Sequence, residues 1–234
     1  MQPTGGGPMA GSIDDVVAQL QAIVGALGQA DGVGCFAAVY LRTTEAMRDR
    51  LGTGYFADDG FVEQFDVIFA DQFFAAVEAD AIAAPVDHAW RGLFESRADR
   101  RVHALQFVLA GMNAHINHDL AIAVVQVCTA RGAEPSAGTV QEDYLKINEV
   151  LAAIEAEVRR RLLADLEMQL PGELEPLLHL CSSWSIDSAR DAAWVKAEAL
   201  WALRDVPVLF DRVVDISSRT TGLVTRHLVT PLLH

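Results

Sequence analysis

The sequence is poor in cysteine and in positive charge. Its 234 residues include three cysteines, and 18 Lys and Arg face 32 Asp and Glu, so the formal net charge is −14. Cys35, Cys128 and Cys181 lie far apart and form no CxxC pair, which favours free thiols in a reducing, cytoplasmic setting. Because nucleic-acid phosphates require a basic face, we expect no nucleic-acid partner.

The sequence also lacks a long uninterrupted apolar run. Residues 1–11 carry no Lys or Arg and no apolar core of a signal peptide, and they are expected to form a flexible tail ahead of one domain over 12–234. The most apolar stretch, 102–130, contains the polar residues Asn113, His115, Asn117, His118 and Asp119. Such groups are costly in hydrocarbon, so we expect no membrane segment.

Familiar catalytic signatures are missing as well. The chain has no GxSxG elbow, no HExxH, no glycine-rich phosphate loop and no dinucleotide-binding glycine fingerprint. Nothing in the sequence therefore favours serine or cysteine nucleophiles or nucleotide chemistry.

Apolar residues recur at helical spacing along almost the whole chain, and no alternating strand pattern of useful length occurs. The pattern predicts an all-α, single-domain bundle of about eight helices. The expected helices cover 12–28, 35–51, a segment starting at Asp58 or Asp59, 86–96, 99–130, 139–168, 174–181, 185–203 and 208–229.

The helix over 99–130 is predicted to be central. Between residues 102 and 130 the only formally charged side chain is Asp119, and apolar side chains fall on every side. A buried carboxylate needs a partner. His115 lies four residues before Asp119 and three before His118, so all three project within about 100° of one another. Asn113 and Asn117 form a second pair, about 200° around the helix from His115.

Three interpretations of this polar cluster stay open. His115 and Asp119, with or without His118, can supply part of a site for zinc, iron or manganese, completed by carboxylates of neighbouring helices. Alternatively, Asp119 orients His115, and the imidazole moves a proton on a bound substrate. In the third interpretation the pair only holds helices together, through an Arg such as Arg190.

The segment Gly111–Leu120 (GMNAHINHDL) resembles the hallmark of an uncharacterised, mainly actinobacterial family of all-helical proteins, a domain of unknown function. The resemblance extends over roughly residues 35–200. It takes in residues 40–44, 61–74, Trp90, 143–148 and 185–194. It implies an all-helical fold, carries over His115, Asn117 and Asp119, and places His118 at a more variable position. No activity is implied.

Further candidates come from other predicted helices. Asp66 lies one helical turn from apolar neighbours, so it either faces inward or lies on a solvated face. Arg190 is the candidate partner for Asp119 or for an anionic substrate group. The phenols of Tyr40 and Tyr144 are candidate donors to a pocket, with simple packing as the alternative. We assign catalysis to His115, Asp119, Asn117 and Arg190, and substrate binding to Asn113, Tyr40, Asp66, Tyr144 and Trp194.

A weaker pattern is typical of the HD-domain phosphohydrolases, all-helical metal enzymes. His88, the His118–Asp119 doublet and Asp143 can be fitted to it, although the spacing in that pattern is loose. Asp143 also lies at the start of a predicted helix, where the dipole alone favours acids.

The sequence predicts a small-molecule enzyme of hydrolase or lyase type that acts on a largely apolar substrate, with or without a divalent metal. One alternative is a metal-free acid–base cyclase or isomerase. The other is a non-catalytic bundle that binds a small molecule or has only a structural role.

Overall fold

The computed structural model describes residues 10–136, 138–169 and 185–232, and all regular structure in these ranges is helical. The helices are α1 (Ile13–Leu27), α2 (Gly32–Arg48), α3 (Asp59–Ala81), α4 (His88–Ser96), α5 (Ala104–Ala114), the π-helix η1 (His115–Asp119), α6 (Leu120–Arg131), α7 (Val140–Gln169), α9 (Ile186–Leu203) and α10 (Pro207–Leu228). The consecutive segments α5, η1 and α6 form one continuous helical rod. When this rod is counted as one helix, the described residues contain eight helices. The all-α prediction is confirmed, while the predicted helix 174–181 lies outside the described residues.

Side-chain caps explain where the helices begin. Ser12, Asp58 and Ser185 accept hydrogen bonds from backbone N–H groups in the first turns of α1, α3 and α9, as their positions in the sequence predict. The second helix was predicted to begin at Cys35, but it begins at Gly32. Asp31 caps it there, because its carboxylate accepts from two backbone N–H groups of the first turn.

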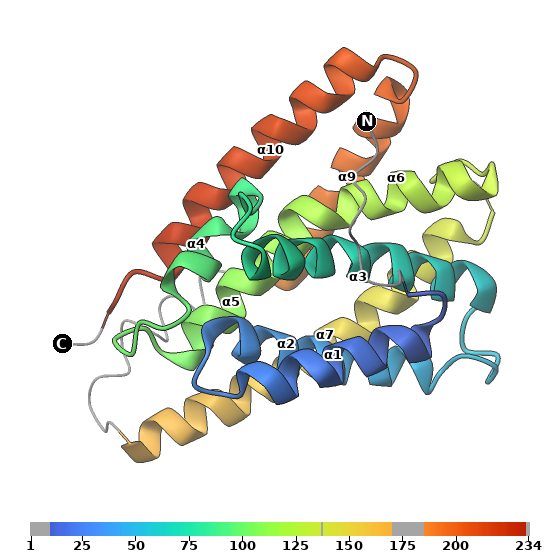
Figure 1. The fold of residues 1–234 in the computed structure, drawn as a ribbon. Coiled ribbons are helices and arrows are strands. Elements are labelled where there is room, and N and C mark those ends of the chain that lie inside the picture. The colour runs from blue at the N-terminus through green and yellow to red at the C-terminus, as the bar shows by residue number, and fades with distance from the viewer. Residues whose placement is uncertain (1–9, 137, 170–184, 233–234) are drawn as a thin grey trace.

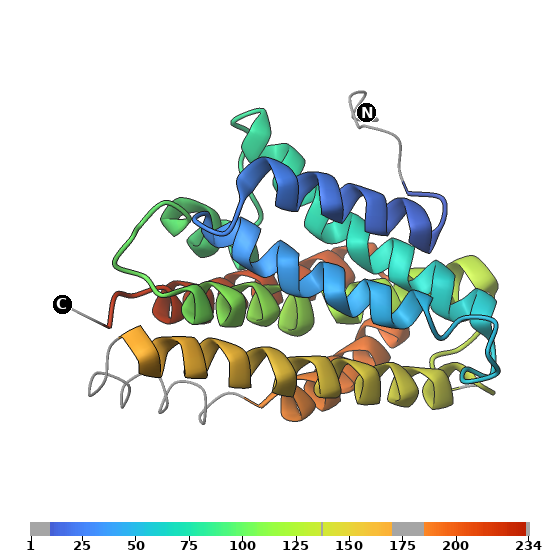
Figure 2. The same ribbon diagram turned by 90° about the horizontal axis from the view of Figure 1, so that it is seen from below.

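The rod runs through the middle of the molecule (Figures 1 and 2). It begins at Ala104, five residues later than predicted, because His103 forms a capping box with Gln106 that starts the helix there. Every residue from Leu105 to Ile116 is buried. The prediction that this helix is buried on all sides is therefore confirmed for this part of the rod, whereas Gln126 and residues 129–131 near its end are exposed.

The remaining helices enclose the rod. In Figure 2, α1, α2 and α3 lie on one side of it and α7 on the other. α2 contacts α5, α3 contacts α6, α9 contacts α6 and η1, and α10 packs against α4 and α5. This arrangement surrounds the centre of the rod with side chains from several helices.

Three further sequence predictions concern membrane segments, the cysteines and the N-terminal residues. None of the described helices is long and apolar enough to cross a membrane. Cys35 and Cys128 are free thiols, and Cys181 lies outside the described residues. Most of the predicted tail 1–11 also lies outside them, but its residue Ala10 is buried.

Candidate functional site

The predicted polar cluster coincides with a break in helical geometry. Residues His115–Asp119 form a π-helical turn in which the Leu120 N–H donates to the His115 carbonyl, five residues back instead of four. Such turns insert one extra residue into an α-helix and are frequent at functional sites. Here the turn lies within the GMNAHINHDL segment.

His115 and Asp119 form the predicted pair, and the structure adds a third member. Asp119 Oδ2 lies 2.9 Å from His115 Nδ1 and accepts a hydrogen bond of 3.0 Å from Trp90 Nε1. Desolvation raises the pKa of Asp119 to about 7, although His118 and the Trp90 donor act in the opposite direction. Desolvation also holds the pKa of His115 well below its usual 6.5. With Asp119 ionised, Nδ1 carries the proton, and Nε2 is left with a lone pair.

Aromatic rings hold the imidazole in place. Phe69 stacks on His115 with ring centroids 3.6 Å apart and planes inclined by 5°. Tyr40 approaches the imidazole edge to face at 4.7 Å, and Phe36 and Trp90 lie within 6 Å. His115 Nε2 is buried and makes no hydrogen bond. The imidazole is thus oriented and desolvated, with one nitrogen unsatisfied.

Two small cavities adjoin this ring. One, of about 50 Å³, is lined by His115 with Tyr40, Phe69 and Arg190. The other, of about 20 Å³, shares the last three of these residues and adds Asp66 and Asn148. Their walls are otherwise largely apolar, including Val39, Met112, Ile116 and Leu151.

Further unsatisfied polar atoms lie around the same two cavities. Tyr40 Oη, Asp66 Oδ2 and Asn148 Oδ1 are buried without a hydrogen-bond partner. Desolvation, with a smaller contribution from Glu63, raises the pKa of Asp66 to about 7. Desolvation also raises the pKa of Tyr40 well above 10. Buried polar atoms without partners are rare and costly, so their convergence makes this place the candidate site.

Arg190 reaches the cavities from α9 and is 1% exposed. The predicted contact with Asp119 is not among the interactions of that carboxylate, since Asp119 Oδ2 is bound by Trp90 and His115. Arg190 Nη1 instead donates to the Asn148 carbonyl at 3.0 Å. Arg190 is therefore part of the cavity wall.

Tyr144 and Trp194 lie behind this wall. Tyr144 Oη donates to the Arg190 carbonyl at 2.9 Å, and its ring lies 4.6 Å from that of Trp194. Neither residue lines either cavity. The structure therefore places them in the packing of α7 against α9, where they position Arg190.

Asn113 and Asn117 face away from the cavities. Asn117 Nδ2 donates to Asn113 Oδ1 at 3.0 Å. Asn113 Nδ2 in turn donates to the Thr221 carbonyl and to Thr225 Oγ1, both on α10. The pair ties the rod to α10, and the 200° separation from His115 explains why it cannot join the same site.

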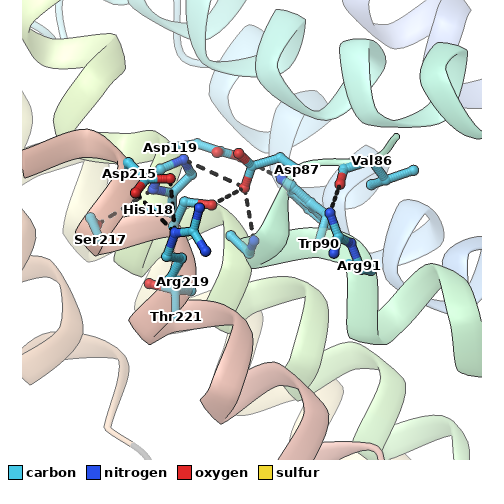
Figure 3. Close-up of polar contacts among 12 residues, drawn as sticks. Val86, Asp87, Trp90, Arg91, His118, Asp119, Asp215, Ser217, Arg219 and Thr221 are labelled. Carbon is cyan, nitrogen blue, oxygen red and sulfur yellow. Dashed lines mark hydrogen bonds and ion pairs between the residues drawn. The ribbon is translucent and has the colours of Figure 1, made fainter. Parts of the chain in front are cut away.

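His118 also points elsewhere. Its Nδ1 lies 3.4 Å from Ser217 Oγ and its Nε2 lies 3.7 Å from Asp87 Oδ1, as Figure 3 shows. Lys196 completes this second cluster by donating to Ser217 Oγ and to the Asn117 carbonyl.

Of the three predicted metal ligands, His115 and Asp119 are in contact, but His118 lies apart from them. Across the described ranges, no group of three or more His, Cys, Asp or Glu is placed to hold an ion. The HD-domain pattern fails for the same reason. Its Asp143 accepts from the backbone N–H groups of Ala57 and Asp58, which ties the loop before α3 to α7.

Sequence reasoning missed several residues of the site. Trp90, Phe69 and Asn148 come from three different helices, α4, α3 and α7, and no local spacing connects them to His115. The one available signal was that all three lie in the stretches that carry the family resemblance, which are Trp90 itself and residues 61–74 and 143–148.

The chain matches one family model over residues 13–231, described as a family of unknown function (DUF5995). It therefore belongs to this family. Comparisons with curated proteins and with solved structures found no match.

Proposed function

We propose, from the geometry of the site, that this protein is an acid–base enzyme of hydrolase, lyase or isomerase type that acts on a small, largely apolar molecule. Membership of the family does not itself imply an activity. One observation carries the proposal. His115 Nε2 is buried and unpartnered beside an apolar cavity, while Asp119 holds the opposite nitrogen of the same ring. A purely structural His–Asp pair has no need of a free nitrogen beside a cavity.

The pair suits His115 to the role of general base. The lowered pKa keeps the imidazole neutral near pH 7, so Nε2 can accept a proton from a substrate C–H or O–H group. The imidazolium that forms is stabilised by the Asp119 carboxylate 2.9 Å from Nδ1. Since Asp119 must be ionised, activity is expected to fall as the pH drops below about 7.

The far end of the cavities supplies polar recognition. Tyr40 Oη can donate to a substrate oxygen, and Asp66, with its pKa raised to about 7, can give or take a second proton. Arg190 provides positive charge for an anionic group. The larger cavity, about 50 Å³, has room for roughly four water-sized groups, so the substrate is small or the wall opens to admit it.

The test follows proton transfer directly. Small apolar compounds that carry one carboxylate, carbonyl or hydroxyl are incubated with the protein in D2O, and proton NMR follows both loss of substrate C–H signal and product formation. His115→Asn should abolish exchange and turnover while the far-UV circular dichroism stays unchanged. The matched control is His88→Asn, on α4 and outside both cavities, which should exchange and turn over as wild type does.

Two results would count against the enzyme. Exchange that persists in the His115→Asn variant places the base elsewhere. Compounds that bind saturably, lose no C–H signal and form no product identify a binding module instead.

A further inference from the structure

The polar groups of the candidate site divide between its two cavities. Asp66 and Asn148 line only the smaller cavity, and His115 lines only the larger one. Tyr40 lines both. The Cα of Asp66 lies about 4.5 Å along the α3 axis from that of Phe69, whose ring stacks on the imidazole. The candidate base and the buried carboxyl therefore line neighbouring cavities that share one wall.

The unsatisfied atoms of the smaller cavity match a hydroxyl group. Asn148 Oδ1 is an amide oxygen, which only accepts hydrogen bonds, whereas Asp66 in its acid form donates one. Burial raises the pKa of Asp66 to about 7, so a substantial share of the acid form is present at neutral pH. A carbonyl or a carboxylate can only accept, and an ammonium can only donate. A hydroxyl does both, and it can therefore satisfy both atoms at once.

The larger cavity suits the carbon skeleton that bears this hydroxyl, because its walls are mostly apolar. A C–H bond of that skeleton can approach His115 Nε2, which is buried and unpartnered. The Tyr40 ring lies 4.7 Å from the imidazole, and its Oη also lacks a partner. This phenol can donate to a carbonyl oxygen on the neighbouring carbon, and that oxygen carries the negative charge formed when the C–H proton leaves.

We propose that this protein is a hydro-lyase that removes water from a small β-hydroxy carbonyl compound, an inference that rests on the proposed function of His115 as the base. His115 Nε2 takes a proton from the carbon between the carbonyl and the hydroxyl-bearing carbon, which leaves an enolate. The enolate electrons then form the C=C bond while the C–O bond to the hydroxyl breaks, and Asp66 gives that oxygen a proton so that water leaves. Exchange with solvent removes the proton from His115 and returns one to Asp66, and no oxidant, reductant or further reactant is needed.

The reaction is tested in D2O by proton NMR, with 4-hydroxybutan-2-one as the probe. Loss of water converts this compound to a vinyl ketone, which gives new alkene signals. Initial rates are compared, because the vinyl ketone reacts with thiols. The wild type should exchange the C–H protons between the carbonyl and the hydroxyl-bearing carbon and should form the alkene. His115→Asn should lose both activities.

Asp66→Asn isolates the role of the acid, because asparagine keeps the size of the side chain but has no acidic proton. Alkene formation by this variant should fall at least about a hundredfold, while C–H exchange persists. In the analogue 4-fluorobutan-2-one the leaving group departs as fluoride and needs no proton. With this probe Asp66→Asn should form the alkene at nearly the wild-type rate, and His115→Asn should not. The matched control is Asp71→Asn, on α3 and outside both cavities, which should behave as wild type with both probes.

The outcomes separate the hydro-lyase from the more general acid–base enzyme. A wild-type protein that exchanges the C–H protons of the hydroxy ketone, or of other small carbonyl compounds, but forms no alkene overturns the hydro-lyase and keeps His115 as the base. A protein that exchanges no C–H proton in any of these compounds overturns both. If Asp66→Asn loses alkene formation equally with the hydroxy and the fluoro probe, or keeps it with both, Asp66 is not the acid.

Discussion

Replacing Asp66 with asparagine should stabilise the protein at neutral pH. Asp66 is buried on α3, and its Oδ2 has no hydrogen-bond partner. The carboxylate form is therefore desolvated in a largely apolar cavity, and one of its oxygens lacks a hydrogen bond. Asparagine has nearly the same shape and carries no charge, and it adds an N–H2 donor to a cavity lined by the unsatisfied Asn148 Oδ1.

The expected magnitude follows from the pKa. A rise from 3.8 to about 7 corresponds to about 4 kcal/mol of penalty on the ionised form once the pH exceeds 7. Relaxation and transient hydration reduce this penalty in real proteins, and the buried amide carries a cost of its own. We therefore expect the free energy of unfolding of the variant to exceed that of wild type by about 1–3 kcal/mol at pH 8.

The direction of the change in stability with pH follows from the protonation of Asp66 in the native and unfolded chains. Between about pH 4 and 7, native Asp66 keeps a proton that the unfolded chain has lost, so this group lowers stability as the pH rises and has no further effect above 7. The Asp119 carboxyl behaves alike in both proteins, and its contribution cancels in their difference. Urea unfolding at several pH values should show the gain of Asp66→Asn growing from near zero at pH 4 to its full value by pH 8.

Asp211→Asn, on the exposed surface of α10, is the matched control and should change stability by less than about 0.5 kcal/mol. If Asp66→Asn destabilises the protein, or if its effect does not vary with pH, the carboxylate is compensated in the native state. The view of this cavity as an unsatisfied ligand site would then be wrong.

Two further predictions test the packing around the site by urea unfolding. Trp90→Phe removes the N–H donor to Asp119 and should lower the free energy of unfolding by about 1–3 kcal/mol; an unchanged value would mean that the 3.0 Å contact contributes nothing. Gly111→Ala places a Cβ 2.3 Å from the Phe36 ring and should destabilise by about 1–3 kcal/mol. Gly25→Ala, within α1 and with open space around it, should stabilise by about 0.5–1 kcal/mol. Equal effects of the two glycine substitutions would contradict this packing argument.

The fold could be predicted because helical periodicity is a local signal. The central rod was evident from apolar residues on all its sides, and Ser12 and Ser185 marked the starts of two helices. The errors were at boundaries, where a cap decides the first turn. His103 is an uncommon capping residue, so the start of the rod at Ala104 was not evident from the sequence.

The candidate site could be predicted only in its local part. The spacing of four residues correctly joined His115 to Asp119, because that contact lies within one helix. Trp90 lies 29 residues away from Asp119 in sequence, and no local sequence pattern predicts their contact. Asn113 and Asn117 were assigned to the site for their polarity, yet their direction around the helix sends them to α10.

The π turn at His115–Asp119 also fixes the rotational phase between the two halves of the rod. Its extra residue turns α6 by about 100° relative to an uninterrupted helix, and the faces that α6 presents to α3 and α9 depend on that offset. An uninterrupted α-helix through the same residues would rotate the apolar side chains of α6 away from both neighbours, whereas deletion of one residue from the turn would restore a regular helix and keep α6 in phase. The turn thus lets the rod carry one more residue than a regular helix without changing how α6 packs, and it does so in the segment that carries His115 and Asp119.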